Sequence, residues 1–96
     1  MRTNNEQAFL RELAILIKKE RIAKGKSRDA LAEVVNLSTR GIEEFETKYT
    51  NIGIVHLLNI VAALHIDLSQ VKALHKEYMQ EEMEERINNL GKYWND

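Results

Sequence analysis

Thr39, Arg40 and Glu44 lie close together in the sequence, and their side chains carry complementary hydrogen-bonding groups. A guanidinium such as that of Arg40 can donate two bonds to O6 and N7 of guanine. The Thr39 side chain can bond a base or touch a thymine methyl, and Glu44 can accept from the amino group of cytosine. Glu44 can equally be a surface acid. Together these side chains could recognise the edges of DNA bases, provided that one helix presents all three on the same side.

The pattern of residues 28–47 predicts two short helices, at about 28–35 and 39–47, joined by a tight turn. The second of them would present Thr39, Arg40 and Glu44. Asn36 suits a left-handed residue after the first helix, and Ser38 suits the N-cap of the second. The apolar residues that recur at helical steps within each half are Leu31, Val35, Leu37, Ile42 and Phe45. The second helix of such a helix-turn-helix pair can enter the major groove of DNA.

A longer segment, from about Ile17 to Val71, resembles the lambda-repressor-like (Cro/C1, xenobiotic-response-element type) helix-turn-helix family. The resemblance rests on KKERIAKGKS, SRDALAEVVNLSTRGIEEFE and NIGIVHLLNIVAALHIDLSQV. It implies an all-α fold, namely a five-helix helix-turn-helix domain over residues 1–74. It also implies that the chain binds double-stranded DNA and regulates transcription.

The resemblance also implies roles for single residues. The positions of Thr39, Arg40 and Glu44 usually read bases in this family. An acidic residue at the position of Glu46 often pairs with an arginine at the position of Arg21, so we expect that ion pair here. The residues expected to contact phosphates are Arg28, Lys48, Tyr49, Thr50 and Asn51. Lys48 stands where the family usually has glycine, and it is the only charged residue of its loop, which predicts a shallow salt dependence of DNA binding.

The remaining helices follow from the apolar spacing and from the absence of proline. We expect helices at about 6–23 and 54–64, and a fifth helix that begins after Asp67 or Ser69. The residues of the fourth helix that are spaced to close the core are Leu57, Leu58, Val61 and Leu64.

Residues 75–96 form an extension beyond the expected domain, and we expect the fifth helix to continue to about residue 89. Its apolar stripe consists of Met79, Met83, Ile87 and Leu90, with Tyr78 beside it and Trp94 near the end. Such a stripe needs a partner. The candidates are the first helix of the same chain, a second copy and a different protein, and we favour a homodimer because groove-reading proteins of this kind usually pair.

The charges are distributed unevenly, although the formal net charge is only −1. Residues 1–48 carry ten Lys or Arg and eight Asp or Glu, whereas residues 49–96 carry four and seven. Between Lys18 and Arg28 there are six basic residues and one acid. This basic edge fits electrostatic docking to DNA, and it fits a solvated helix end about equally well.

Several kinds of chemistry find no support in the sequence. Cysteine is absent, and the three histidines, at 56, 65 and 75, are not spaced as a helical metal pair. No nucleophile elbow, P-loop or dinucleotide fingerprint occurs, so we expect neither an enzyme nor a cofactor. The polar start predicts no signal peptide, and no apolar run reaches a membrane span. We therefore expect a cytoplasmic protein without a membrane partner.

These observations predict a sequence-specific DNA-binding transcriptional regulator, most simply a dimeric repressor on a palindromic operator. One alternative is the antitoxin of a toxin–antitoxin operon, which would autorepress and bind a toxin through the C-terminal helix. A second alternative is a protein-interaction module that keeps the helix-turn-helix fold but no longer binds DNA.

Overall fold

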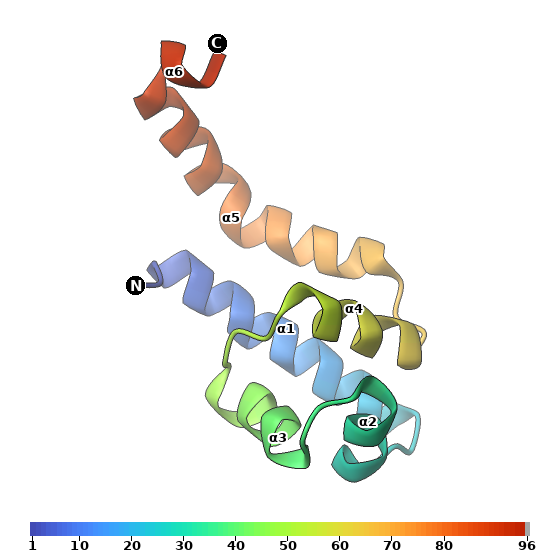
Figure 1. Cartoon of the computed structure of the whole chain (residues 1–96). Coiled ribbons are helices and arrows are strands. Elements are labelled where there is room, and N and C mark those ends of the chain that lie inside the picture. Colours follow the sequence, from blue (N-terminus) through green and yellow to red (C-terminus); the bar gives the residue numbers. More distant parts are fainter. Residues whose placement is uncertain (96) are drawn as a thin grey trace.

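Six helices follow one another along residues 1–95, which are the part of the chain that the computed structural model describes (Figure 1). They are α1 (Asn4–Ala23), α2 (Arg28–Val35), α3 (Thr39–Lys48), α4 (Ile54–Ala63), α5 (Leu68–Leu90) and α6 (Lys92–Asn95). The described residues contain no strand, so the predicted all-α class is confirmed. The sequence predicted five helices, and the short α6 is an addition that follows Gly91, where φ is +56°.

Side-chain caps fix where most of these helices begin. Thr3 and Glu6 form a reciprocal capping box at the start of α1. Ser27 accepts from the backbone N–H of Ala30 at 3.0 Å, and Ser38 accepts from that of Gly41 at 2.9 Å. Asp67 caps α5 in the same way through Ser69. Each cap satisfies a backbone donor that the first turn of a helix leaves unpaired.

The turn between α2 and α3 depends on a left-handed residue at Asn36, whose φ and ψ are 59° and 43°. Asn tolerates this conformation better than most residues. The next residue, Leu37, donates its backbone N–H to the carbonyl of Ala32 at 3.0 Å, which closes the end of α2. Asn36 and the Ser38 cap therefore set the angle between the two helices.

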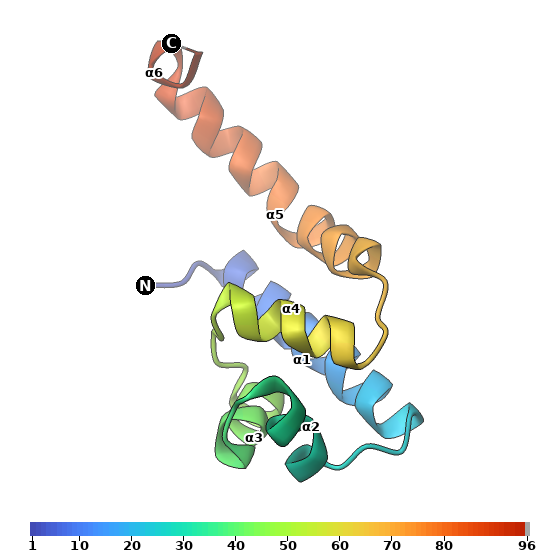
Figure 2. The same ribbon diagram turned by 45° about the vertical axis from the view of Figure 1, so that its right-hand side comes forward.

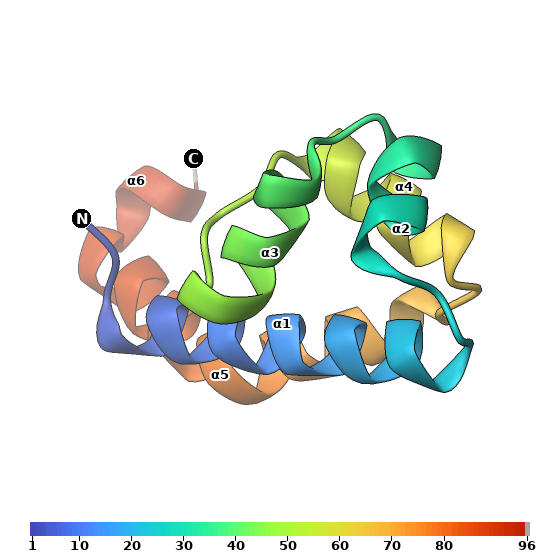
Figure 3. The ribbon, with the colours of Figure 1, turned by 90° about the horizontal axis from the view of Figure 1, so that it is seen from below.

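The core lies between α1 and the α2–α3 pair and extends to α4 and the start of α5 (Figure 3). Its largest fully buried side chains are Phe45, Ile17, Ile42, Ile60, Leu64 and Val35. One core prediction was wrong. Leu58 was expected to close the core, but it lies on the outer side of α4 and is exposed.

Helix α5 packs along α1, so the boundary expected at residue 74 falls inside a continuous helix. The rings of Phe9 and His75 meet edge to face with centroids 5.3 Å apart. Glu82 accepts from the Thr3 hydroxyl and from the Asn5 amide, each at 3.2 Å. These contacts tie the first part of the extension to the chain's own N-terminal helix.

The residues expected to contact a partner differ in exposure, because the first part of the extension packs on α1. Met79 is buried within its own chain, so this residue of the stripe is not accessible to a second copy or to another protein. Tyr78, Met83 and Ile87 are half-buried. Leu90 and Trp94 are exposed, and Figures 1 and 2 show the last turns of α5 with α6 projecting beyond the other helices.

Candidate nucleic-acid interface

The outward side of α3 carries polar side chains around a shallow hollow. The residues that line the hollow are Arg40, Glu43, Glu44, Thr47 and Lys48. The opposite side of α3 places Ile42 and Phe45 in the core. The helix is therefore anchored by its apolar face and offers hydrogen-bonding groups on its free face.

Arg40 and Glu44 contact each other one turn apart on this free face. The Nε of Arg40 donates to Oε1 of Glu44 at 2.9 Å, while 84% of the Arg40 side chain remains exposed. The two residues expected to read bases are thus brought together as an ion pair. Because the pair uses Nε, the Nη1 and Nη2 groups remain the pair of donors that is suited to guanine O6 and N7.

Thr39, the first residue of α3, already donates its hydroxyl hydrogen within the protein. The acceptor is Oδ1 of Asp29 on α2, at 2.7 Å. The hydroxyl oxygen can still accept a bond, and the methyl group can still touch a thymine methyl. Thr39 therefore also ties the start of α3 to α2, a role that the sequence did not indicate.

The residues expected to contact phosphates occupy different environments. Lys48 and Asn51 are exposed, and Thr50 is half-buried. Tyr49 takes a left-handed conformation with φ 56°, and its side chain packs partly against the core. The carbonyl of Tyr49 accepts from Nη1 of Arg2 at 3.2 Å. This packing makes Tyr49 a loop anchor, whereas Lys48, the last residue of α3, keeps its charge exposed.

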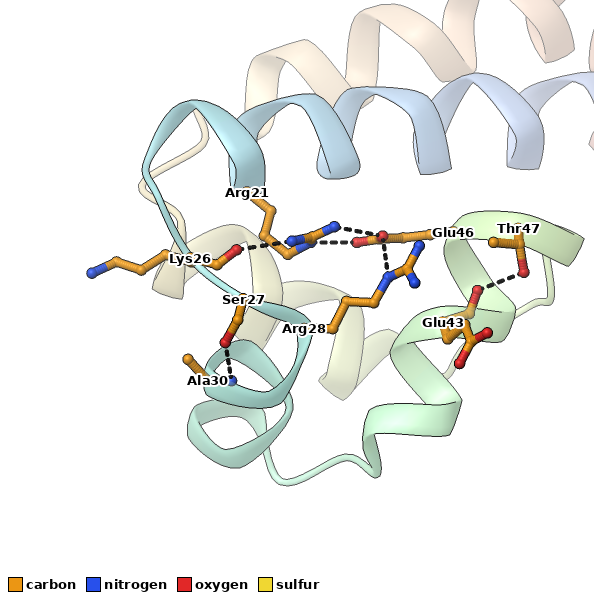
Figure 4. A network of polar contacts seen from close by, with 8 residues as sticks. All are labelled: Arg21, Lys26, Ser27, Arg28, Ala30, Glu43, Glu46 and Thr47. Atoms are coloured by element: carbon orange, nitrogen blue, oxygen red, sulfur yellow. Dashed lines mark hydrogen bonds and ion pairs between the residues drawn. The ribbon is translucent and has the colours of Figure 1, made fainter.

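Arg28 was expected to meet phosphate, but it is bound to Glu46 in the structure. Its Nε donates to Oε1 of Glu46 at 3.0 Å, and a third of its side chain remains exposed (Figure 4). This bond was not predicted from the sequence, because the two residues are 18 positions apart. The start of α2 is thereby joined to the end of α3.

Glu46 is the centre of a buried polar network that includes Arg21 of α1 (Figure 4). Arg21 donates from Nε to Oε2 at 2.7 Å and from Nη2 to Oε1 at 2.9 Å, which is the pair that the family resemblance implied. Its Nη1 donates to the carbonyl of Lys26 at 2.8 Å. The network therefore links α1, the loop before α2, and α3.

The Glu46 side chain is 0% exposed, which would by itself disfavour its charged form. Burial raises the pKa of Glu46, but the hydrogen bonds and positive charges of Arg21 and Arg28 outweigh it and hold the pKa below its ordinary value of 4.5. Glu46 is thus ionised at neutral pH and satisfied by two guanidinium groups. Through these bonds Glu46 connects α3 to α1 and to the start of α2.

Within residues 1–95 no group of three or more acidic, histidine or cysteine side chains is arranged to hold a metal ion. No helix in this part of the chain is long and apolar enough to span a membrane.

Comparison with known proteins shows a family match for the middle of the chain. A protein-family model described as "Helix-turn-helix" matches residues 17–71, which is more than half of the chain. No curated protein and no solved structure gives a significant match. The matched segment begins within α1, contains α2, α3 and α4, and ends in the first turns of α5.

Proposed function

The chain belongs to the Cro/C1-type helix-turn-helix family, and from this premise we propose that it is a homodimeric repressor that reads a palindromic operator with α3. The family assignment makes the chain a DNA-binding regulator of transcription. The proposal adds the residues that read DNA, the dimer and the direction of regulation.

One observation carries the proposal, namely the exposed Arg40 side chain whose Nε is held by Glu44 on the free face of α3. A guanidinium held by one edge keeps two donors directed away from the carboxylate. Such a donor pair is the commonest means by which proteins recognise guanine. Thr39 adds a methyl group and an acceptor at the adjacent position. Lys48, Thr50, Asn51 and the outer groups of Arg28 supply phosphate contacts.

The dimer follows from the small reading surface. A single short helix contacts only a few base pairs, and two half-sites about 34 Å apart are needed for useful specificity in this class of protein. A dimer that covers such an operator would block the access of polymerase. We therefore assign repression, without a cofactor and without enzymatic activity, as the role of the chain.

Binding to duplex DNA tests this proposal directly. We would titrate a fluorescent random-sequence duplex with the protein and with Arg40→Ala, at low and at physiological salt. The proposal expects salt-dependent binding of the random pool by both proteins, since phosphate contacts supply non-specific affinity. It further expects both proteins to enrich particular sequences from the pool, and Arg40→Ala to lose the preference at one base pair of each half-site. Absence of binding by the parent protein at low salt would refute the proposal.

The antitoxin alternative is favoured by the projecting end of the chain. Leu90, Tyr93 and Trp94 are exposed there, beside a row of glutamates on α5. An apolar patch next to acidic side chains suits a basic partner protein. A pull-down with the full chain, compared with Trp94→Ala, would reveal a toxin that requires this end.

The interaction-module alternative is favoured by the acids on α3. Glu43 and Glu44 face the same side as Arg40, and Glu44 neutralises it in the free protein. Under this alternative Arg40→Ala would leave every activity of the chain unchanged. A changed sequence preference of that variant at any base pair would exclude the interaction-module alternative.

A further inference from the structure

The surface of α4 differs from the other surfaces of the chain in its lack of charge. The 18 residues from Tyr49 to Ile66 include no Asp, Glu, Lys or Arg, although these types make up 30% of the chain. The exposed residues of α4 are Ile54, Val55, Leu58, Asn59 and Ala62. Four of these five are apolar, so α4 exposes a largely hydrophobic face.

The exposed apolar residues of α4 are neighbours on one helix rather than scattered over the surface. Ile54, Val55 and Leu58 are 66%, 64% and 43% exposed, and Ile54 and Leu58 are one helical turn apart. Single apolar residues on a surface are ordinary, but a contiguous apolar face marks a contact site. A helix whose outer side meets water normally carries charged residues there. We conclude that this side of α4 is a contact surface for another protein chain.

The absence of charge on the α4 face favours an uncharged partner surface. An acidic or basic partner would find no group on α4 with which to pair. A second copy of the same face meets neither like-charge repulsion nor an unpaired buried charge when two copies associate about a two-fold axis.

The extension is the rival surface for self-association, and its charges argue against it. Glu77, Glu81 and Glu85 are exposed at successive turns of α5. Two copies meeting along this row would bring carboxylates together, which opposes association. The first apolar residue of the extension, Met79, is already buried within its own chain.

We propose that two copies of this chain associate through the α4 face formed by Ile54, Val55, Leu58 and Ala62. This inference rests on the proposed dimeric function and assigns its interface. Helix α4 lies on the side of the domain away from α1, and no other helix lies in front of it in Figure 1. α3 lies at the lower end of the domain in the same view. None of the residues of the α4 face lines the hollow on the free face of α3, so we expect contact through α4 to leave both hollows open to DNA.

Molecular mass in solution tests the interface without DNA. We would measure the dimer dissociation constant by sedimentation equilibrium for the parent chain, Leu58→Glu and Val55→Glu. Both side chains are exposed in one copy, so the fold should persist, and circular dichroism with thermal melting checks this. We expect each variant to raise the dissociation constant by about tenfold or more, as truncation or charging of a central interface residue does.

Two matched leucines serve as comparisons, because both are 52% exposed on α5. Leu68→Glu controls for the loss of an exposed apolar residue, and Leu90→Glu tests the rival interface. The inference expects parent-like dimers from both. It is overturned if Leu90→Glu dissociates the dimer while Leu58→Glu does not, or if the parent chain is a monomer at all concentrations tested.

Failure of this inference is distinguishable from failure of the proposed function. Arg40 belongs to α3 and not to the α4 face, so Arg40→Ala should retain the parent dimer mass while one base pair of each half-site loses its preference. A parent chain that dimerises through α4 but selects no DNA sequence would uphold the interface and refute the repressor. A parent chain that selects DNA through Arg40 but dimerises elsewhere would uphold DNA reading and refute the interface.

Discussion

The Nε of Arg40 donates to Oε1 of Glu44 at 2.9 Å, so this arginine and a carboxylate one turn later on α3 form a single unit. The bond uses one edge of the guanidinium and leaves the Nη1 and Nη2 edge for another acceptor. Glu44 thereby orients Arg40, and we propose that it acts as a positioning residue. The separate contact to cytosine that the sequence suggested for Glu44 is the alternative.

Glu44→Ala should therefore reduce discrimination at the same base pair that Arg40 reads. Loss of the Arg40 contact should cost about 1–3 kcal/mol of discrimination there. Loss of Glu44 should cost less, about 0.5 kcal/mol, because an exposed pair of this spacing holds its partner weakly. Fluorescence anisotropy with operators that differ at single base pairs measures both. If Glu44→Ala relaxed a different base pair, Glu44 would be an independent reader.

The buried network around Glu46 predicts a large effect on stability. Arg21→Ala should lower the free energy of unfolding by about 3–5 kcal/mol, because it leaves a buried carboxylate without its main partner. Arg28→Ala should lower it by about 1 kcal/mol or less, since that pair is partly exposed. Urea unfolding followed by circular dichroism provides the values. Equal effects of the two variants would contradict the view that burial determines the contribution of each pair.

Acid should weaken the fold through the same residue. The pKa of Glu46 in the folded chain lies below its ordinary value of 4.5, so its ionised form contributes stability that is fully present above pH 4.5. That contribution is lost as the pH falls through the lower, folded-state pKa. Glu46→Gln should consequently be less stable than the parent at neutral pH and show a shallower loss of stability in acid. Parallel curves for the two proteins would rule out this linkage.

Comparison with the parent is needed because Glu6 and Asp67 have lowered pKa values as well. Backbone hydrogen bonds at Thr3 and Ser69 are the main causes. Their contributions to the acid loss of stability should appear in both proteins and cancel in the difference.

The phosphate contacts predict a modest salt dependence of DNA binding. Lys48 is exposed at the end of α3, and Arg28 shares its guanidinium with Glu46. Lys48→Ala should reduce the slope of log affinity against log salt by about 0.9, the value for one neutralised phosphate. It should weaken all sequences alike. Anisotropy titrations across a salt series supply the slopes, and an unchanged slope would remove Lys48 from the interface.

Local chemistry made the helix-turn-helix pair predictable from the sequence. Asn36 and Ser38 act on backbone groups within a few residues, so their roles as left-handed turn and N-cap follow from residue type. The Arg28–Glu46 and Asp29–Thr39 bonds could not be predicted, because they depend on how α2 and α3 cross. Leu58 was misassigned because helical spacing does not tell which side of an apolar helix faces its own core. The same spacing arises when a second molecule covers that side.

Base reading by Arg40 is best tested by selection of bound sequences from random duplex DNA, carried out with the parent chain and with Arg40→Ala. We expect a palindromic motif for the parent chain, with two half-sites related by one turn of DNA. In Arg40→Ala one base pair of each half-site should lose its preference while the remainder of the motif persists. An identical motif from both proteins, or no motif from the parent chain, would contradict the claim that Arg40 on α3 reads the operator.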